Sequence, residues 1–375
     1  MAMREMTSRQ RFLAVLHGDM PDRVPATVHQ WQVYHLRHYM HLEDDLEAFR
    51  HCGLDAVIYP SWPASVQNEN WQISREQSDR GDGSLEIRLE INTPGGRLTQ
   101  KSVGTDYTVS ETEFLIKNPE DIDLIDQYLP VPVLDPDAVK ARKEALGSSG
   151  ILRLFTNGPQ GSPWQDACMY CGTENMIYHA FDRPEWVHAF LEILLRKKIE
   201  FFERNIGPRP GVFDMIETGG GAGSNTVISP SMFKEFCLPY DKRQHEAIRT
   251  LDPDIAVSYH TCGGMMQLLD LIPGNGCDIS ETLSPVGCGG DIRDNIDEAT
   301  VKSTLGGRVK LMGGINQIQV LTQGDPNDIY RDVERAFKGY GDGGGYIMMP
   351  SDHFFHAPRE NLLVYGQAAR ELCHY

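Results

Sequence analysis

Eight short apolar segments, each running into a turn and most then into a stretch of helical periodicity, constrain this fold more than any other feature. The segments are residues 23–29, 55–59, 151–157, 212–217, 255–259, 278–281, 309–312 and 345–349. Strands that alternate with helices build a parallel sheet, and eight such units close into a barrel. We therefore predict a single (β/α)8 TIM barrel spanning residues 1–375, of α/β class.

One region, at about residues 64–130, interrupts this alternation. Residues 84–92 alternate apolar and polar side chains, Thr93-Pro-Gly-Gly96 forms a turn, and the alternation resumes at Arg97. This pattern is typical of an antiparallel hairpin. The sequence thus predicts an antiparallel β-hairpin inserted between strands 2 and 3 of the barrel.

Composition excludes several classes of function. The formal net charge is -18 and the isoelectric point is about 5.1, whereas nucleic-acid binding requires a basic surface. No apolar run approaches the roughly 20 residues of a membrane span. The first ten residues have no apolar signal core, so we expect a cytoplasmic protein. Eight cysteines are too few for a disulfide scaffold in a chain of this length.

Polar residues stand at the ends of the predicted strands. They are His29, Tyr59, Asn157, Glu217, His260, Cys262, Glu281, Asn316, Asp352 and His353. Any one of them could be a helix cap or a satisfied core residue. Because the carboxyl ends of all barrel strands meet at one mouth, we expect them to converge there.

His260 and Cys262 are the strongest candidates for chemistry in this set. They lie where a strand gives way to the turn Gly263-Gly264 and to residues 265–272, which have helical spacing. Imidazole and thiolate are usual zinc ligands, and a catalytic zinc has about three protein ligands and one open position. Glu281 and either Asp352 or His353 could complete the site. Two ligands alone would be equally consistent with a buried structural pair.

The run Gly219-Gly-Gly-Ala-Gly223 has neither the spacing of a dinucleotide site nor the lysine of a P-loop. We interpret it as a loop that allows the backbone to approach a ligand closely.

Several motifs resemble the uroporphyrinogen decarboxylase superfamily. They are Thr7-Ser-Arg-Gln-Arg-Phe-Leu13, Pro21-Asp-Arg-Val-Pro25, Thr93-Pro-Gly-Gly96, Ser229-Pro-Ser-Met-Phe233 with Pro239-Tyr240, His260-Thr-Cys-Gly263, Gly313-Gly-Ile315, and Gly343-Gly-Gly-Tyr-Ile347 with Glu360-Asn-Leu362. The resemblance covers nearly the whole chain and implies a (β/α)8 barrel.

Within that superfamily the chain is more similar to the corrinoid-linked zinc methyltransferases. The decarboxylases carry an arginine-rich stretch after strand one and an aspartate after strand two. Here residues 30–38 contain one arginine, and residues 59–62 contain no acid. The methyltransferase branch has the His-x-Cys pair, and Glu281 stands where its glutamate ligand is expected. The usual cysteine near strand eight is missing, since that position reads Pro350-Ser-Asp-His353.

The resemblance therefore implies a zinc-dependent methyltransferase or demethylase. It would move a methyl group between a small methylated substrate, or a thiol, and a corrinoid (cobalamin) on a partner protein. The metal ligands would be His260, Cys262, Glu281 and Asp352. The catalytic groups would be Glu217, His29, Tyr59 and His353, and Asn157, Asn316 and Trp31 would bind substrate. A homodimer is also compatible with this prediction.

Two further functions stay open at this point. One is a decarboxylase or lyase that acts on a small carboxylic acid without corrinoid, with Glu217 and His353 as acid and base. The other is a binding barrel without enzymatic activity.

Overall fold

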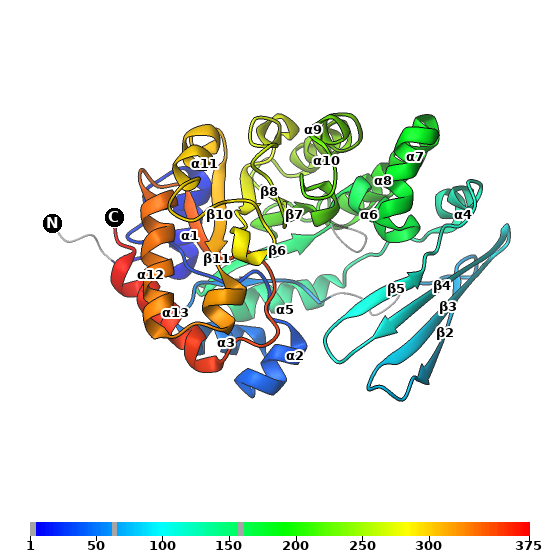
Figure 1. Cartoon of the computed structure of the whole chain (residues 1–375). Coiled ribbons are helices and arrows are strands. Elements are labelled where there is room, and N and C mark those ends of the chain that lie inside the picture. Colours follow the sequence, from blue (N-terminus) through cyan, green and yellow to red (C-terminus); the bar gives the residue numbers. More distant parts are fainter. Residues whose placement is uncertain (1–4, 62–65, 157–160) are drawn as a thin grey trace.

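The computed structural model describes residues 5–61, 66–156 and 161–375. In these residues the parallel sheet has seven strands, in the order β1-β6-β7-β8-β9-β10-β11 (Figure 1). Their bounds are β1 Ala56–Ile58, β6 Gly150–Phe155, β7 Met215–Gly219, β8 Ala256–His260, β9 Ile279–Thr282, β10 Lys310–Ile315 and β11 Tyr346–Pro350. The sheet is curled, as the strand order of a barrel requires.

The described residues also form α-helices, most of which lie on the outer side of this sheet (Figure 1). They are α1 Ser8–His17, α2 Val33–His35, α3 Asp45–Cys52, α4 Asp121–Tyr128, α5 Pro136–Leu146, α6 Pro163–Cys171, α7 Thr173–Asp182, α8 Pro184–Asn205, α9 Pro230–Met232, α10 Leu238–Leu251, α11 Glu298–Leu305, α12 Pro326–Ala336 and α13 Arg359–Leu372. None of the helices in the described part of the chain is both long and apolar enough to cross a membrane.

The predicted strand at residues 23–29 is not a strand of this sheet, and that prediction was wrong in detail. The segment forms an isolated parallel bridge from Ala26 to Met348 of β11. On its other side the carbonyl of Ala26 accepts a hydrogen bond of 2.8 Å from the N–H of Asp55, next to β1. The segment thus lies between the two edge strands, and Pro25, which has no N–H to donate, shortens its ladder.

The inserted region is larger than predicted. Instead of a hairpin, it is a four-stranded antiparallel sheet in the order β2-β3-β4-β5. The predicted hairpin corresponds to β3 (Leu85–Thr93) and β4 (Gly96–Gly104), and β2 (Gln72–Asp79) and β5 (Val109–Glu113) flank it. The two flanking strands are polar and largely exposed, so they lack the apolar alternation by which a strand is predicted from sequence.

The predicted helix at residues 265–272 does not form. The segment is a series of turns followed by a short 3-10 helix, η4 (Ile272–Asn275). Most of its hydrogen bonds join residues three apart, such as Leu268 N to Met265 O at 2.8 Å, and one joins Ile272 N to Leu268 O, four residues apart, at 2.9 Å. Pro273 restricts the residue before it and stops a helix from extending, which leaves too few residues for a stable α-helix.

The barrel interior is filled in layers. Towards the amino ends of the strands lies an apolar layer, to which α1 contributes Phe12 and Val15. The strands and the residues next to them contribute Val57, Ile151, Met215, Ala256, Ile279, Met312, Ile347 and Met349. Side chains two residues apart on a strand point the same way. The next inward positions are Arg153, Glu217, Ser258 and Glu281, so a polar layer lies directly above the apolar one.

Candidate functional site

Arg153 lies at the centre of the polar layer and was not among the predicted site residues. Its side chain has no exposed surface, and Nη2 donates to Glu281 Oε2 at 2.5 Å and to Ser258 Oγ at 2.6 Å. The same nitrogen lies 3.3 Å from Glu217 Oε2. Nε and Nη1 find no hydrogen-bond partner among the described residues. The strand period placed Arg153 on the inward face with Ile151, and this signal could have identified it.

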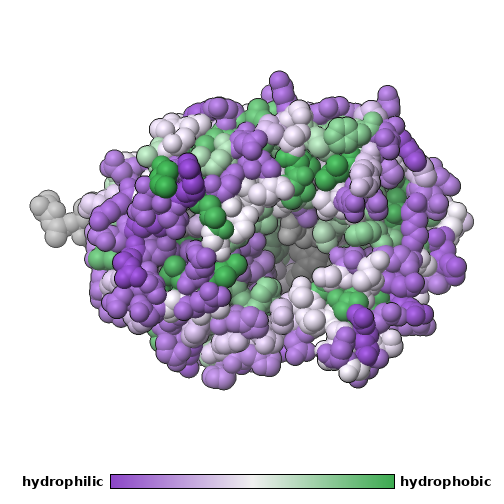
Figure 2. Space-filling view, in the orientation of Figure 1, coloured by the Kyte–Doolittle hydropathy of each residue, from purple (hydrophilic) through white to green (hydrophobic). Residues whose placement is uncertain are grey.

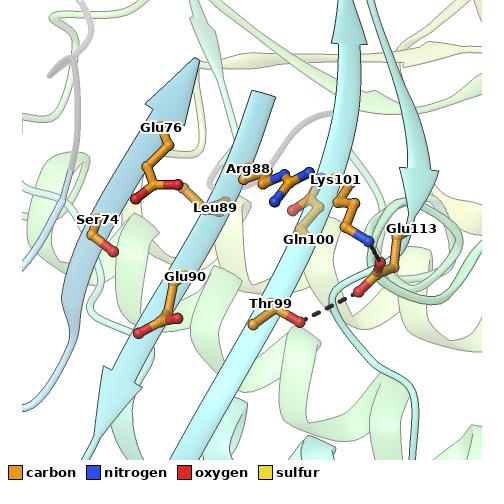
Figure 3. Close-up of a pocket in the computed structure, with 9 residues that line it drawn as sticks. All are labelled: Ser74, Glu76, Arg88, Leu89, Glu90, Thr99, Gln100, Lys101 and Glu113. Atoms are coloured by element: carbon orange, nitrogen blue, oxygen red, sulfur yellow. Dashed lines mark hydrogen bonds and ion pairs between the residues drawn. The ribbon is translucent and has the colours of Figure 1, made fainter. Parts of the chain in front are cut away.

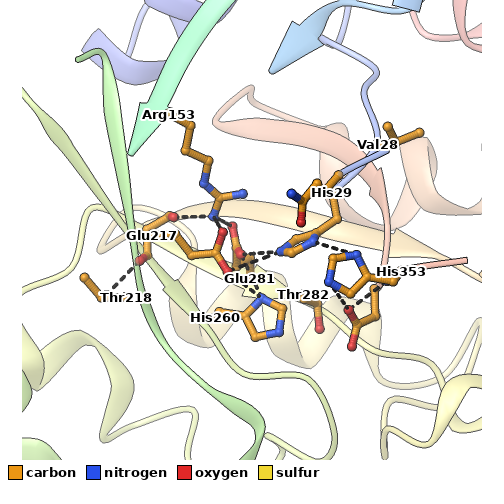
Figure 4. Close-up of polar contacts among 12 residues, drawn as sticks. Val28, His29, Arg153, Glu217, Thr218, His260, Glu281, Thr282 and His353 are labelled. Carbon is orange, nitrogen blue, oxygen red and sulfur yellow. Dashed lines mark hydrogen bonds and ion pairs between the residues drawn. The ribbon is translucent and has the colours of Figure 1, made fainter. Parts of the chain in front are cut away.

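The two buried carboxylates are held ionised by their neighbours (Figure 4). Burial opposes the charge, but Arg153 and His29 lower the pKa of Glu217 well below its usual value. Arg153 and His260 likewise lower the pKa of Glu281. Burial raises the pKa of Tyr59 well above its usual value, and its hydroxyl donates to Glu217 Oε2 at 2.9 Å. Tyr59 therefore holds its proton against an acceptor.

His260 is oriented by Glu281. Its Nδ1 lies 2.9 Å from Glu281 Oε1 and 3.6 Å from Glu217 Oε1. Burial disfavours a charged ring, but Cys262, which hydrogen bonds to the imidazole, and Glu281 raise the pKa of His260 well above its usual value. With Nδ1 directed at Glu281, the other ring nitrogen is the one available to a ligand.

His29 is buried and links the carboxylates to His353, which is partly exposed. His29 Nε2 lies 3.3 Å from Glu217 Oε1, and His29 Nδ1 lies 3.4 Å from His353 Nδ1 (Figure 4). Burial and the neighbouring His29 lower the pKa of His353 to about 4. Burial opposes ionisation of Asp352, but His260 and His353 lower its pKa.

Three overlapping groups of these residues have metal-ligating atoms within 4.8 Å of one another. They are His29 with Glu217, His260 and Glu281; His29 with Asp352 and His353; and His260 with Cys262 and Asp352. Three of the four predicted metal ligands thus form one group. Glu281, the fourth, belongs to the buried group beside Arg153.

The glycine run packs against the predicted metal ligands. A side chain at Gly219 would collide with the backbone of His260, and one at Gly221 would lie 2.8 Å from Cys262 Sγ. Gly219 also has a φ of +88°, which favours glycine. The loop thus lies in close contact with the end of β8 (Ala256–His260) and with Cys262, and its close approach to a ligand stays a prediction.

The structure does not bring every predicted residue to the cluster. Asn316 caps the π-helix η6 (Gln317–Thr322) by accepting from the N–H groups of Ile318 and Gln319. Trp31 is buried in the core between Phe49 and Phe354, so neither side chain joins the cluster, and substrate binding by these two residues stays a prediction. Asn157 lies outside the described residues.

Cys288 and Asp352 differ in how they relate to the metal-capable groups. Cys288 donates to Asn316 Oδ1 at 3.1 Å and belongs to none of the three groups found among the described residues. Asp352 belongs to two of them and does not cap α13, because Pro358 is the N-cap of that helix and makes no side-chain cap bond. Asp352 Oδ1 accepts instead from the N–H of His353 at 2.7 Å.

The insert sheet reaches the mouth through Tyr107, which contacts the rings of Tyr34, Phe355 and His356. Tyr107, in the β4–β5 turn, packs on Tyr34 and His356 with ring centroids 5.2 and 5.3 Å apart. The face of the molecule seen in Figure 2 is hollowed near its centre, between the barrel and the insert. The mouth is therefore bounded on one side by the barrel and on the other by the insert.

A solved structure with a similar fold is a methyltransferase from Methanosarcina mazei. The alignment covers 98% of this chain and 99% of that chain, with a TM-score of 0.66 and 16% sequence identity. At this identity the likeness shows the fold alone.

Curated relatives are uroporphyrinogen decarboxylases. The protein of Ralstonia pickettii (strain 12J) is 27% identical over 220 residues, which are 56% of this chain and 54% of the relative. That of Xylella fastidiosa (strain Temecula1 / ATCC 700964) is 28% identical over 217 residues, 56% of this chain and 55% of the relative. The chain spans about half the length of the curated relatives that it matches. The model of the uroporphyrinogen decarboxylase (URO-D) family matches residues 114–372, and the chain belongs to this family.

Proposed function

We propose that this protein is a zinc-dependent methyltransferase or demethylase. It would move a methyl group between a small methylated substrate and a corrinoid carried by a partner protein. The observation that supports this most directly is the group formed by His260, Cys262 and Asp352, which offers nitrogen, sulfur and oxygen to one ion. The similar fold of the Methanosarcina mazei methyltransferase is consistent with the proposal.

The donor set fits zinc at this group better than at the buried one. Arg153 already places a cation 2.5 Å from Glu281 and 3.3 Å from Glu217, and a second cation among these carboxylates would be repelled. Both oxygens of Glu281 are engaged, one by Arg153 and the other by His260. Glu281 would then orient His260 from behind, an arrangement common around zinc-bound histidines. The proposed ligands are His260, Cys262 and Asp352.

Bound zinc would supply a Lewis acid at the mouth. Around it, Glu281 fixes the ring orientation of His260, and Asp352 takes the place of the cysteine found in the methyltransferase branch. Glu217 offers a buried carboxylate for orienting substrate, and Tyr59 and His29 adjoin it as proton donors. His353 borders the same space.

The charge at the mouth argues against a polycarboxylated substrate. Among the described residues of the cluster, Arg153 carries the guanidinium group. It is fully buried and already forms an ion pair with Glu281. A substrate with several carboxylates would face the negative charges of Glu217, Glu281 and Asp352, and the proposed zinc could pair with one of its carboxylates but not with several. Porphyrinogen decarboxylation is therefore not the activity that we propose.

The finer features of fold and setting belong to the same proposal. Segment 23–28, hydrogen-bonded to β11 and to the start of β1, would complete a closed (β/α)8 barrel. The protein would act in the cytoplasm, and we keep a homodimer as a prediction to be measured.

The test is a methyl-transfer assay with the zinc-loaded protein. Methylated substrates are incubated with free cob(I)alamin, and formation of methylcobalamin is followed by its absorption spectrum. We expect transfer that depends on cobalamin and is lost in Cys262→Ser. Turnover of a small acid with release of carbon dioxide and without any corrinoid would instead favour a lyase, with Glu217 and His353 as acid and base.

A further inference from the structure

Asp352 belongs to two of the three metal-capable groups at the mouth, one with His260 and Cys262 and the other with His29 and His353. A carboxylate has two oxygens and can bridge two ions. We propose that the mouth binds a second divalent metal ion, held by His29 and His353 and by Asp352 as a shared ligand. This inference rests on the proposed function for the first ion and extends it.

The two imidazoles are arranged as ligands of one ion. Their rings are nearly perpendicular, with an interplanar angle of 78° and centroids 4.6 Å apart, and Nδ1 of each faces Nδ1 of the other at 3.4 Å. Two facing N–H groups would repel each other, so at least one of these nitrogens presents a lone pair. A cation between them would use the lone pairs of both.

Gln32 is a further donor to this position. Its Nε2 lies 2.9 Å from His353 Nδ1, so the amide marks that nitrogen as an acceptor. Rotation of the amide by half a turn would present Oε1 to the same point, and oxygen is a good ligand for a divalent ion. The position thus has two nitrogens, a carboxylate and an amide oxygen within reach.

The charge balance of the cluster accommodates a second ion. Glu217, Glu281, Asp352 and a thiolate at Cys262 carry four negative charges against the single positive charge of Arg153. One divalent ion would still leave the cluster negative by one charge. In a low-dielectric environment such residual charge attracts a further cation.

The second position differs from the first in access and in chemistry. Of the two imidazoles of the outer set, His353 has 29% of its side-chain surface exposed and His29 has 3%, whereas His260 of the inner set is 4% exposed. The outer set contains no sulfur, so we expect it to bind zinc more weakly than the inner set. Paired ions act together on the oxygens of a substrate. The outer ion would therefore favour methylated substrates that carry an oxygen next to the transferred group.

The experiment is a metal titration of the full-length protein, first stripped with a chelator. Bound zinc is measured after equilibrium dialysis over a range of free zinc, and cobalt(II) spectra report thiolate ligation. We expect two equivalents per chain whose affinities differ by at least about 10-fold. His353→Ala and His29→Ala should each abolish the weaker equivalent and keep the cobalt–thiolate band. Cys262→Ser should abolish the band, and Asp352→Asn should weaken both equivalents.

His356→Ala is the matched control. His356 lies three residues after His353 on the same loop, is exposed, and its ring is hydrogen-bonded to Tyr39 at 3.0 Å. Loss of the weaker equivalent in this variant, or its survival in His353→Ala, would assign it to surface histidines and overturn the proposal. Saturation at one equivalent would also overturn it and leave the first site intact. Failure to bind the thiolate-linked ion would instead count against the proposed function.

Discussion

The barrel interior and the insert sheet both contain ion pairs between a basic side chain and a glutamate, but in opposite surroundings. In the barrel, Arg153 and Glu281 pair with neither side chain exposed. In the insert, Lys101 and Glu113 pair with 44% and 32% of their side-chain surfaces exposed. Figure 3 shows this exposed pair at a pocket of the insert sheet that is lined mostly by polar side chains.

The comparison shows that burial, more than the identity of the pair, decides what a charge contributes. Water screens an exposed pair, and each partner is solvated almost as well alone. A buried partner that loses its counterion has neither water nor charge to replace it. Changes of equal chemistry in the two regions should therefore have very different effects.

The largest effect is expected for Arg153→Met. The change leaves Glu217 and Glu281 buried beside each other without their shared cation. We expect unfolding free energy to fall by about 3–5 kcal/mol, measured by urea denaturation at pH 7.5. Arg88→Met in the insert, where Arg88 pairs with Glu86 at 60% and 33% exposure, is the matched control and should be close to neutral. Equal losses in both variants would remove the distinction between the regions.

A smaller effect on stability is expected on acidification, and it comes from the buried His245 on α10. His245 Nδ1 lies 2.9 Å from the carbonyl oxygen of Asn275, and its Nε2 is hydrogen-bonded to Thr218. Burial lowers the pKa of His245 to about 3. On acidification the unfolded chain therefore takes up a proton at this histidine before the folded chain does. The contribution of neutral His245 to the free energy of unfolding is complete above pH 6.5. It is lost as pH falls towards 3, at up to about 1.4 kcal/mol per pH unit.

The measurement is the urea unfolding free energy of the native protein and of His245→Gln between pH 7 and pH 4. We expect the variant to be less stable at pH 7 but to lose less stability on acidification. Parallel curves would show that His245 does not carry the pH dependence.

A local effect is expected for Gly221→Ala. Gly221 and Gly223 both lie in the 3-10 helix η2 (Gly221–Gly223). A Cβ at Gly221 would stand 2.8 Å from Cys262 Sγ, whereas one at Gly223 would make ordinary contacts at 3.8 Å. Displacement of the thiol should weaken zinc binding about 10-fold, as measured with a competing chelator, and Gly223→Ala should not. Unchanged affinity in Gly221→Ala would mean that the loop yields more easily than the thiol.

The smallest effect is expected in the insert, for Glu113→Gln. Lys101 and Lys117 lower the pKa of Glu113 to about 2, yet all three side chains are in contact with water. We expect the melting temperature to change by no more than about 1 °C and zinc binding to stay the same. A large loss of stability would show that the outer face of the sheet supports the barrel mouth.

The sequence was most informative where the signal is local. The predicted strands 84–92 and 97 onward match β3 and β4. In both, the period of apolar residues and the Pro or Gly at an end are properties of neighbouring residues. Segment 23–29 and residues 265–272 carried the same kinds of pattern, but the conformation of each depends on Pro25 or Pro273 and on partners elsewhere in the fold.

The sequence by itself determined which chemical groups stand at the strand ends. The reason is that the succession of strands and the alternation of their side chains both follow from patterns of neighbouring residues. His260, Cys262 and Asp352 could be expected at one mouth for that reason. Only the tertiary structure decided which of them pair. It turned Asn316 towards a helix end, buried Trp31, and placed Arg153 against Glu281. Such pairings depend on the curvature and stagger of strands far apart in the sequence, which no local pattern encodes.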